Sequence, residues 1–144
     1  MQTDQRTAQG TGVAKIRALL IAARPLLQAD AREFALAYPK KLPPRGQPFP
    51  DPSSAISHMR AHLQALRTAV LAEPGGSAAG ASARELTALA LLETDQSLDK
   101  LSQSYAASDR SSASELREES IRLANQAKST SVKAGKALGI PWPL

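Results

Sequence analysis

Apolar residues recur along this chain at intervals of three and four, the spacing that places them on one face of an α-helix. Segments rich in proline, glycine and serine divide this pattern into four stretches. The apolar stripe of the first stretch consists of Val13, Ile16, Leu20, Ala23, Leu27 and Phe34. The stripe of the second consists of Ile56, Met59, Leu63, Leu66 and Val70. Both stretches are therefore predicted to form amphipathic helices.

The third and fourth stretches show the same spacing with different strength. The third stripe consists of Leu91, Leu98, Leu101 and Tyr105, broadened by Leu86, Leu89 and Leu92. The fourth consists of Ala113, Leu116, Leu123, Ala127, Ala134 and Leu138. Ser120 and Thr130 interrupt the fourth stripe, so this stretch has the weakest helical pattern of the four.

Proline and glycine mark several helix ends. Asp51 followed by Pro52 predicts an N-cap side chain and then proline at the first helical position. Gly139 follows the fourth stripe and is predicted to adopt the left-handed C-cap conformation. Pro25 lies inside the first stretch and removes a helical hydrogen bond, so we expect a kink there or two shorter helices that meet near Arg24.

Two serines predict where the third and fourth helices begin. Ser82 with Glu85, and Ser112 with Glu115, have the spacing of a capping box. In this motif the two side chains satisfy each other's free backbone N–H groups. The chain between Pro74 and Ala81 is consequently expected to be a loop of small residues.

A helix buries only one stripe, so four stripes must converge on a shared core. We therefore expect an all-α fold, a single-domain four-helix bundle over residues 13–138. Polar residues 1–12 are predicted to form a flexible N-terminal arm, and residues 139–144 an extended apolar C-terminal tail. The segment 39–50 holds five prolines and is predicted to be a long, stiff connection between the first two helices.

The composition supports the all-α prediction and excludes functions that depend on cysteine. The chain holds 27 Ala and 19 Leu but only 5 Ile and 3 Val. Alanine and leucine favour helices, whereas strands favour β-branched and aromatic residues. Cysteine is absent, which excludes disulfides, thiolate metal sites and thiol nucleophiles.

Charge is distributed unevenly over the two halves. Residues 1–72 carry ten Lys/Arg and four Asp/Glu, a net charge of +6, whereas residues 73–144 carry eight and nine, a net charge of −1. This asymmetry is typical either of a basic face for nucleic acid or anionic lipid, or of basic helices packed beside acidic ones. No apolar run approaches a membrane span and no signal peptide is evident, so we expect a cytoplasmic protein without membrane contact.

The sequence shows no catalytic, cofactor or metal motif. His58 and His62 lie four residues apart on one helix face, but neither belongs to the Glu-x-x-His pattern of metal-binding bundles. The glycine-rich segment after Pro74 lacks the lysine of a phosphate loop. We therefore predict no catalytic residue, no cofactor and no metal ion.

Arginines flank the apolar stripes of the first two predicted helices. These residues are Arg17, Arg24, Arg60 and Arg67. They have two interpretations. The first is pairing with carboxylates of other helices, for which Asp95 and Glu119 are candidates. The second is a stripe that contacts phosphates, to which Lys15 also belongs.

The tail is the other candidate contact surface. It holds the only tryptophan, Trp142, between two prolines that prevent helix formation. Alternation in an extended chain places Ile140, Trp142 and Leu144 on one side. We expect this apolar set to pack against the protein's own helices, a second copy or another protein.

Together these features predict a non-enzymatic helical-bundle protein that acts through protein–protein contacts, as an adaptor, regulator or assembly subunit. Its partner would be another protein or a second copy of the chain. The alternative is an accessory nucleic-acid-binding protein that uses the basic face of the first two helices.

Overall fold

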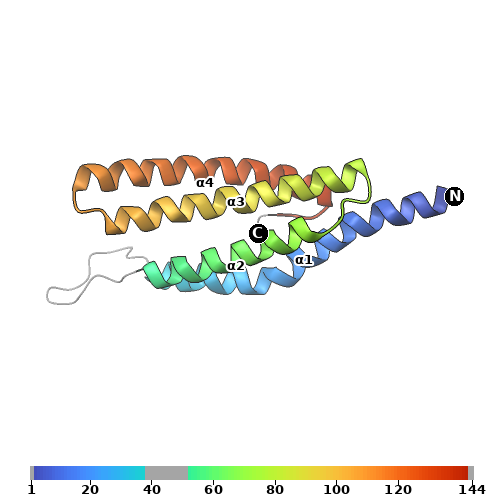
Figure 1. Cartoon of the computed structure of the whole chain (residues 1–144). Helices are drawn as coiled ribbons and strands as arrows, with labels where there is room; N and C mark the ends of the chain where they lie inside the picture. Colours follow the sequence, from blue (N-terminus) through green and yellow to red (C-terminus); the bar gives the residue numbers. More distant parts are fainter. Residues whose placement is uncertain (1, 38–51, 143–144) are drawn as a thin grey trace.

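The computed structural model describes residues 2–37 and 52–142, and for residues 2–11 it describes the backbone only. Its helices are α1 (Gln2–Ala37), α2 (Ser53–Ala72), α3 (Ala78–Ala106) and α4 (Arg110–Leu138) (Figure 1). No strand occurs within these two ranges. The protein is an all-α four-helix bundle, as the periodicity predicts.

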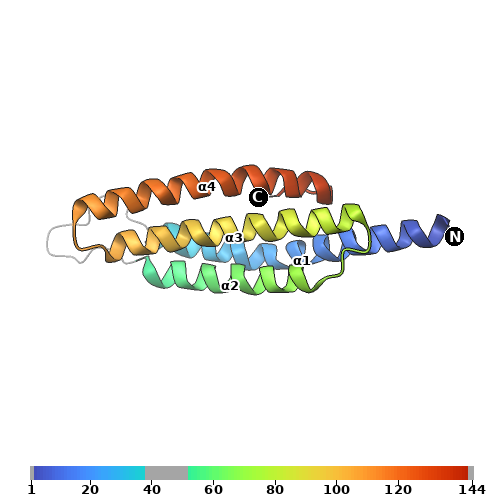
Figure 2. The same cartoon turned by 45° about the horizontal axis from the view of Figure 1, so that its top comes forward.

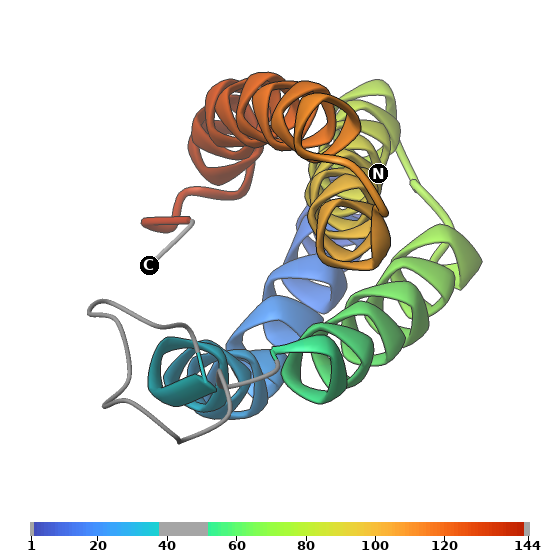
Figure 3. The same cartoon turned by 90° about the vertical axis from the view of Figure 1, so that its left-hand side faces the viewer.

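The helices do not contact one another equally. Helix α3 packs extensively against α4 and α2 and also contacts α1, whereas α1 and α4 barely touch. The views of Figures 2 and 3 show this arrangement, with α3 between α4 and the pair formed by α1 and α2. The chain leaves α4 on the side of the bundle that faces α1 (Figure 3). The α1–α4 side is therefore the least closed part of the bundle.

Both predicted capping boxes lie inside helices, so these two predictions are wrong. Helix α3 begins at Ala78, because the Ser77 hydroxyl accepts a hydrogen bond of 3.0 Å from the Gly80 N–H. The predicted small-residue loop is correspondingly shorter. Helix α4 begins at Arg110, because the Asp109 carboxylate accepts a bond of 2.7 Å from the Ser112 N–H. The backbone and side-chain hydrogen bonds from Ser112 lower the pKa of Asp109.

The other predicted helix ends have different outcomes. Gly139 adopts the left-handed conformation with φ of 69°, which confirms the predicted C-cap. The Ile140 N–H then donates to the Gly135 carbonyl over 3.0 Å, which turns the chain back along α4. Helix α2 begins at Ser53, with Pro52 at the cap position and no side-chain cap bond. Asp51, the predicted cap, lies outside the described residues.

Helix α1 is longer than predicted and is a single helix. It continues through Pro25, so two separate helices do not form there, and the predicted kink stays a prediction. Its backbone is helical from residue 2, over the predicted arm (Figure 1). The proline-rich connection at 39–50 lies outside the described residues.

The core forms where α1, α2 and α3 meet, and the end of α4 completes it. Its fully enclosed side chains include Ile16, Leu20, Val70 and Leu138. These residues belong to the stripes predicted for the first, second and fourth stretches. The stripes therefore identify the core-facing side of each of these helices.

Small residues form the contact between α3 and α4. They recur every seven residues, as Ala83, Ala90, Ser97 and Ser104 on α3 and as Ala113, Ser120, Ala127 and Ala134 on α4. All except Ala113 are buried. Small side chains at heptad spacing let two antiparallel helices approach closely along their whole length. We call this contact the small-residue seam.

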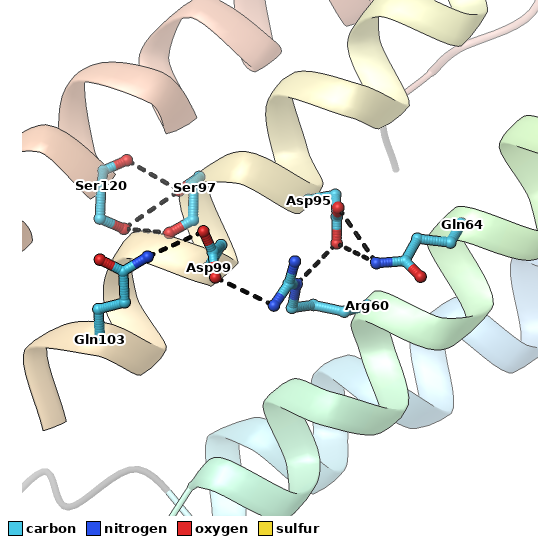
Figure 4. A network of polar contacts seen from close by, with 7 residues as sticks. All are labelled: Arg60, Gln64, Asp95, Ser97, Asp99, Gln103 and Ser120. Carbon is cyan, nitrogen blue, oxygen red and sulfur yellow. Dashed lines mark hydrogen bonds and ion pairs between the residues drawn. The ribbon is translucent and has the colours of Figure 1, made fainter. Parts of the chain in front are cut away.

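A reciprocal serine pair lies within the small-residue seam. The Ser97 hydroxyl donates to the Ser120 carbonyl, and the Ser120 hydroxyl donates to the Ser97 carbonyl, both over 2.8 Å (Figure 4). The pair satisfies two buried hydroxyls and sets the register of the helices. In that register Ala90 lies opposite Ala127, and Ala83 opposite Ala134. Ser120 therefore belongs to the contact rather than interrupting it.

Three glycines allow another close approach, where α1 and α3 meet the loop after α2. Gly12, Gly75 and Gly80 are all buried. A Cβ atom added to either Gly12 or Gly80 would overlap the backbone carbonyl oxygen of Gly75. Glycine at these helical positions is therefore required by space, although neither has a positive φ.

Candidate functional site

Arg60 confirms the predicted pairing with carboxylates of another helix. Its Nε donates to Asp95 over 2.8 Å and its Nη1 to Asp99 over 3.1 Å, both on α3 (Figure 4). Gln64 also donates to Asp95, over 3.3 Å. The hydrogen bond to Asp95 raises the pKa of Arg60 further, so the guanidinium stays charged. This cluster joins α2 to α3 and neutralises the charge of Arg60 with two carboxylates.

The other candidate basic residues lie on two sides of the bundle. Arg67 lies with Arg60 at the junction of α2 and α3, where it lines a small hollow beside Asp95. Arg17 and Arg24 lie on the α1–α4 side, where the Arg17 Nε donates to the Leu138 carbonyl over 2.8 Å. Lys15 is exposed. The other candidate carboxylate, Glu119, lies near Lys100 and Arg122 instead.

Arg24 and Arg67 share an unusual feature. The Nε atom of each is buried and has no hydrogen-bond partner among the described residues. A buried donor without a partner costs about 1–3 kcal/mol, so native proteins rarely leave one. Each of these arginines therefore has unused hydrogen-bonding capacity in a partly desolvated setting.

The two histidines join α2 to α1. His62 Nδ1 lies 2.6 Å from the carboxylate of Asp30, which is only 4% exposed, and His58 Nδ1 lies 3.1 Å from that of Glu33. Both acidic residues of the second half of α1 therefore face α2. No group of three metal-ligating side chains occurs in the part of the chain that the structure describes.

The tail packs against the protein's own core. Ile140 and Trp142 both contact the core cluster, and both stay partly exposed. This confirms that the tail docks on its own helices, one of the predicted alternatives. Leu144, the third member of the predicted apolar set, lies outside the described residues.

Gly135 creates the space for the tail. A Cβ at this position would lie 2.8 Å from the Ile140 carbonyl oxygen and 3.0 Å from that of Trp142, closer than packed atoms allow. The tail backbone therefore crosses α4 directly over Gly135.

We expect Gly135→Ala to displace the tail while leaving α4 intact, because alanine favours the helix but excludes the tail backbone. The emission of Trp142, the only tryptophan, should then shift to longer wavelength, and its quenching by iodide should increase. Ala137→Ser, at an exposed position of the same helix, is the control. An unchanged Trp142 spectrum in Gly135→Ala would contradict this account of docking.

A pocket of about 270 Å³ lies between the helices, and we call it the central pocket. All four helices and the tail line it. Its apolar wall consists of Leu27, Ala31, Met59, Leu63, Ala90 and Leu91. Trp142 covers part of it, so the docked tail forms one wall of the pocket.

Few polar groups line the central pocket. Arg24 is the only charged side chain among the described residues that line it. The Thr94 hydroxyl donates to the Ala90 carbonyl within α3, which uses its proton. Ser131 is 5% exposed, and its hydroxyl makes no hydrogen bond to another described residue. Gln28 adds a neutral amide from α1. The pocket thus combines an apolar body with one cation, one amide and the Ser131 hydroxyl.

A second hollow adjoins the central pocket on the other side of Trp142. It is shallower and lies between α4 and the tail, lined by Lys128, Val132 and Lys136 among others. Nearby on α4, Ile121 is 61% and Val132 45% exposed. Positions 121, 128 and 132 share one helix face, which is therefore both apolar and basic.

The sequence pattern points to Arg24 and Trp142 but not to their proximity across the pocket. It gives no emphasis to Ser131 or Gly135. A glycine inside a helical pattern just before the tail is a usable signal for close backbone approach.

No helix within the described ranges is long and apolar enough to cross a membrane. Comparison with protein family models, with curated proteins and with solved structures finds no match to this chain.

Proposed function

We propose that this is a non-enzymatic protein that acts through protein contacts, and that it binds its partner on the side between α1 and α4. This surface, the α1–α4 face, consists of Ile21, Arg24, Ile121, Lys128 and Val132 with Trp142 between the helices. The observation that carries the proposal is that α1 and α4 barely touch while both present apolar side chains there. Ile21, for example, is 49% exposed.

The charge of the α1–α4 face indicates the chemistry of the partner. Arg24 and Lys128 contribute positive charge to it. The acidic residues of the second half of α1, Asp30 and Glu33, face α2 instead. An apolar face with basic residues complements an amphipathic helix that carries acidic residues beside its apolar stripe. We therefore propose an acidic amphipathic helix of another protein as the occupant.

A pair of designed peptides tests this proposal. One is an 18-residue amphipathic helix with leucines at helical spacing and glutamates beside them, about 27 Å long. The other replaces every glutamate by lysine. We expect saturable binding of the acidic peptide, measured by calorimetry and by Trp142 emission, and at least about tenfold weaker binding of the basic one.

Two variants locate the peptide on the surface. Lys128→Glu lies on the α1–α4 face and should weaken binding of the acidic peptide. Lys133→Glu makes the same charge change on another face of α4 and should have a smaller effect, because it acts only at long range. Equal effects of the two variants would contradict the proposed surface, and absence of saturable binding would contradict the proposal.

The nucleic-acid alternative has less support. Of its five candidate residues, Arg60 and Arg17 already have intramolecular acceptors. The remaining cations lie on two sides of the bundle. A DNA titration distinguishes the two functions, because binding through several phosphates weakens steeply with salt. Tight, salt-sensitive binding of DNA without peptide binding would favour the alternative.

A further inference from the structure

The central pocket has the composition of a small-molecule site. Ligand pockets are mostly apolar and carry a few polar groups that orient the ligand. Here the apolar wall comes from α1, α2, α3 and the tail, and the polar groups are confined to a few positions of α1, α3 and α4. Residues of this chain alone line the pocket, so its use does not depend on a partner protein.

Two polar groups of the pocket lack partners independently of each other. Arg24 lines it with a buried Nε that no described residue satisfies. Ser131 lines it from α4, is only 5% exposed, and leaves its hydroxyl without a partner among the described residues. Buried polar groups are normally hydrogen-bonded, so the Arg24 Nε calls for an acceptor that a ligand can supply. The Ser131 hydroxyl can donate to the same ligand, because it lines the same pocket.

We propose that the central pocket binds a small monocarboxylate with an apolar chain or ring. The carboxylate would accept hydrogen bonds from the Arg24 guanidinium and the Ser131 hydroxyl. The apolar part would lie against Leu27, Met59 and Leu63. This inference goes beyond the proposed protein contact and requires no second protein.

The charge of the pocket favours a carboxylate over a phosphate. Arg24 supplies one positive charge, and its planar guanidinium matches a carboxylate in shape. A phosphate carries more negative charge than the single positive charge of Arg24 balances. The predominantly apolar lining would also leave the remaining phosphate oxygens desolvated without donors.

The volume limits the size of the ligand. An apolar cavity of about 150 Å³ accommodates benzene. The central pocket, at about 270 Å³, accordingly accommodates roughly ten to twelve non-hydrogen atoms. Decanoate and 4-phenylbutyrate both fall in this range, whereas a long-chain fatty acid exceeds it.

Titration of the full chain with decanoate, below its micelle concentration, tests the proposal. Calorimetry should show one saturable site, and the emission of Trp142 should change with the same dissociation constant. Decanol has the same chain without the charge and should bind at least about tenfold more weakly, because it cannot make the charge-assisted hydrogen bond to Arg24. Equal binding of decanol would overturn the assignment of a carboxylate.

Three variants locate the ligand. Arg24→Gln should weaken decanoate binding by about tenfold or more. Arg67→Gln removes the other arginine with an unpartnered buried Nε, which lies outside the central pocket, and should leave binding unchanged. Ala31→Leu fills the pocket from an exposed edge of α1 and should abolish binding while circular dichroism shows an intact helical fold.

Three results would overturn the proposal. The first is the absence of saturable decanoate and phenylbutyrate binding. The second is an equal loss of affinity in Arg24→Gln and Arg67→Gln, which indicates a nonspecific charge effect. The third is full binding in Ala31→Leu, which places the ligand elsewhere. Each result can be obtained without the acidic peptide, so this proposal fails or stands separately from the proposed function.

Discussion

Replacing Gly80 by alanine is expected to destabilise the protein by about 1–3 kcal/mol, the usual cost of forcing extra atoms into a packed site. The new Cβ would overlap the Gly75 carbonyl oxygen, so the loop after α2 would have to move. The direction of this effect is informative, because glycine to alanine inside a helix ordinarily stabilises by about 0.5–1 kcal/mol. Urea unfolding followed by circular dichroism measures the change.

Gly12 provides an independent test of the same contact. It approaches the Gly75 carbonyl from α1, so Gly12→Ala should also destabilise. Ser82→Ala, at an exposed position of α3, is the control and should be nearly neutral. Stabilisation by alanine at both glycines would show that α1, α3 and the loop do not approach this closely.

A second large effect is expected in the small-residue seam. Ala127 is 5% exposed on α4 and lies opposite Ala90 in the register that the serine pair sets. Leucine at this position would push α3 and α4 apart, and we expect Ala127→Leu to cost about 3 kcal/mol or more, the upper end for overpacking.

The control makes the same substitution where space is available. Ala137 lies on α4 and is exposed, so Ala137→Leu should change the free energy of unfolding by less than about 0.5 kcal/mol. Equal stability of the two leucine variants, measured by urea unfolding, would contradict the close approach of α3 and α4.

Large apolar residues are enough to predict the helices and much of the core. Ile16, Leu20 and Val70 are buried where the stripes place them. The stripe of the third stretch is less informative, because Leu89 is 47% exposed while Ala83 and Ser97 are buried. Leucine marks a buried helix face only when the neighbouring helix leaves room for it. The α3–α4 contact uses small residues, which the spacing of large apolar side chains does not reveal.

The candidate site is predictable only in part. The arginines at heptad positions on two helices stand out in the sequence, and Asp95 is a partner of Arg60 as predicted. The local sequence does not show that the Arg24 Nε lacks a partner, because this depends on which helices lie beside α1. The starts of α3 and α4 are also hard to predict from local sequence. For each helix, an earlier N-cap residue (Ser77 or Asp109) and a later capping box (at Ser82 or Ser112) both fit the local sequence.

The small-residue seam also bears on the order in which the protein folds. Only residues 107–109 separate α3 from α4, so the seam contact nearest this turn, Ser104 with Ala113, closes a short loop, and the later contacts then extend a hairpin that has already formed. Helix α1 must instead meet α3 across a much longer stretch of chain. Loop closure costs less entropy when the loop is short. The α3–α4 hairpin is accordingly the part of the chain that can form first, and α1 and α2 then complete the core on a preformed surface.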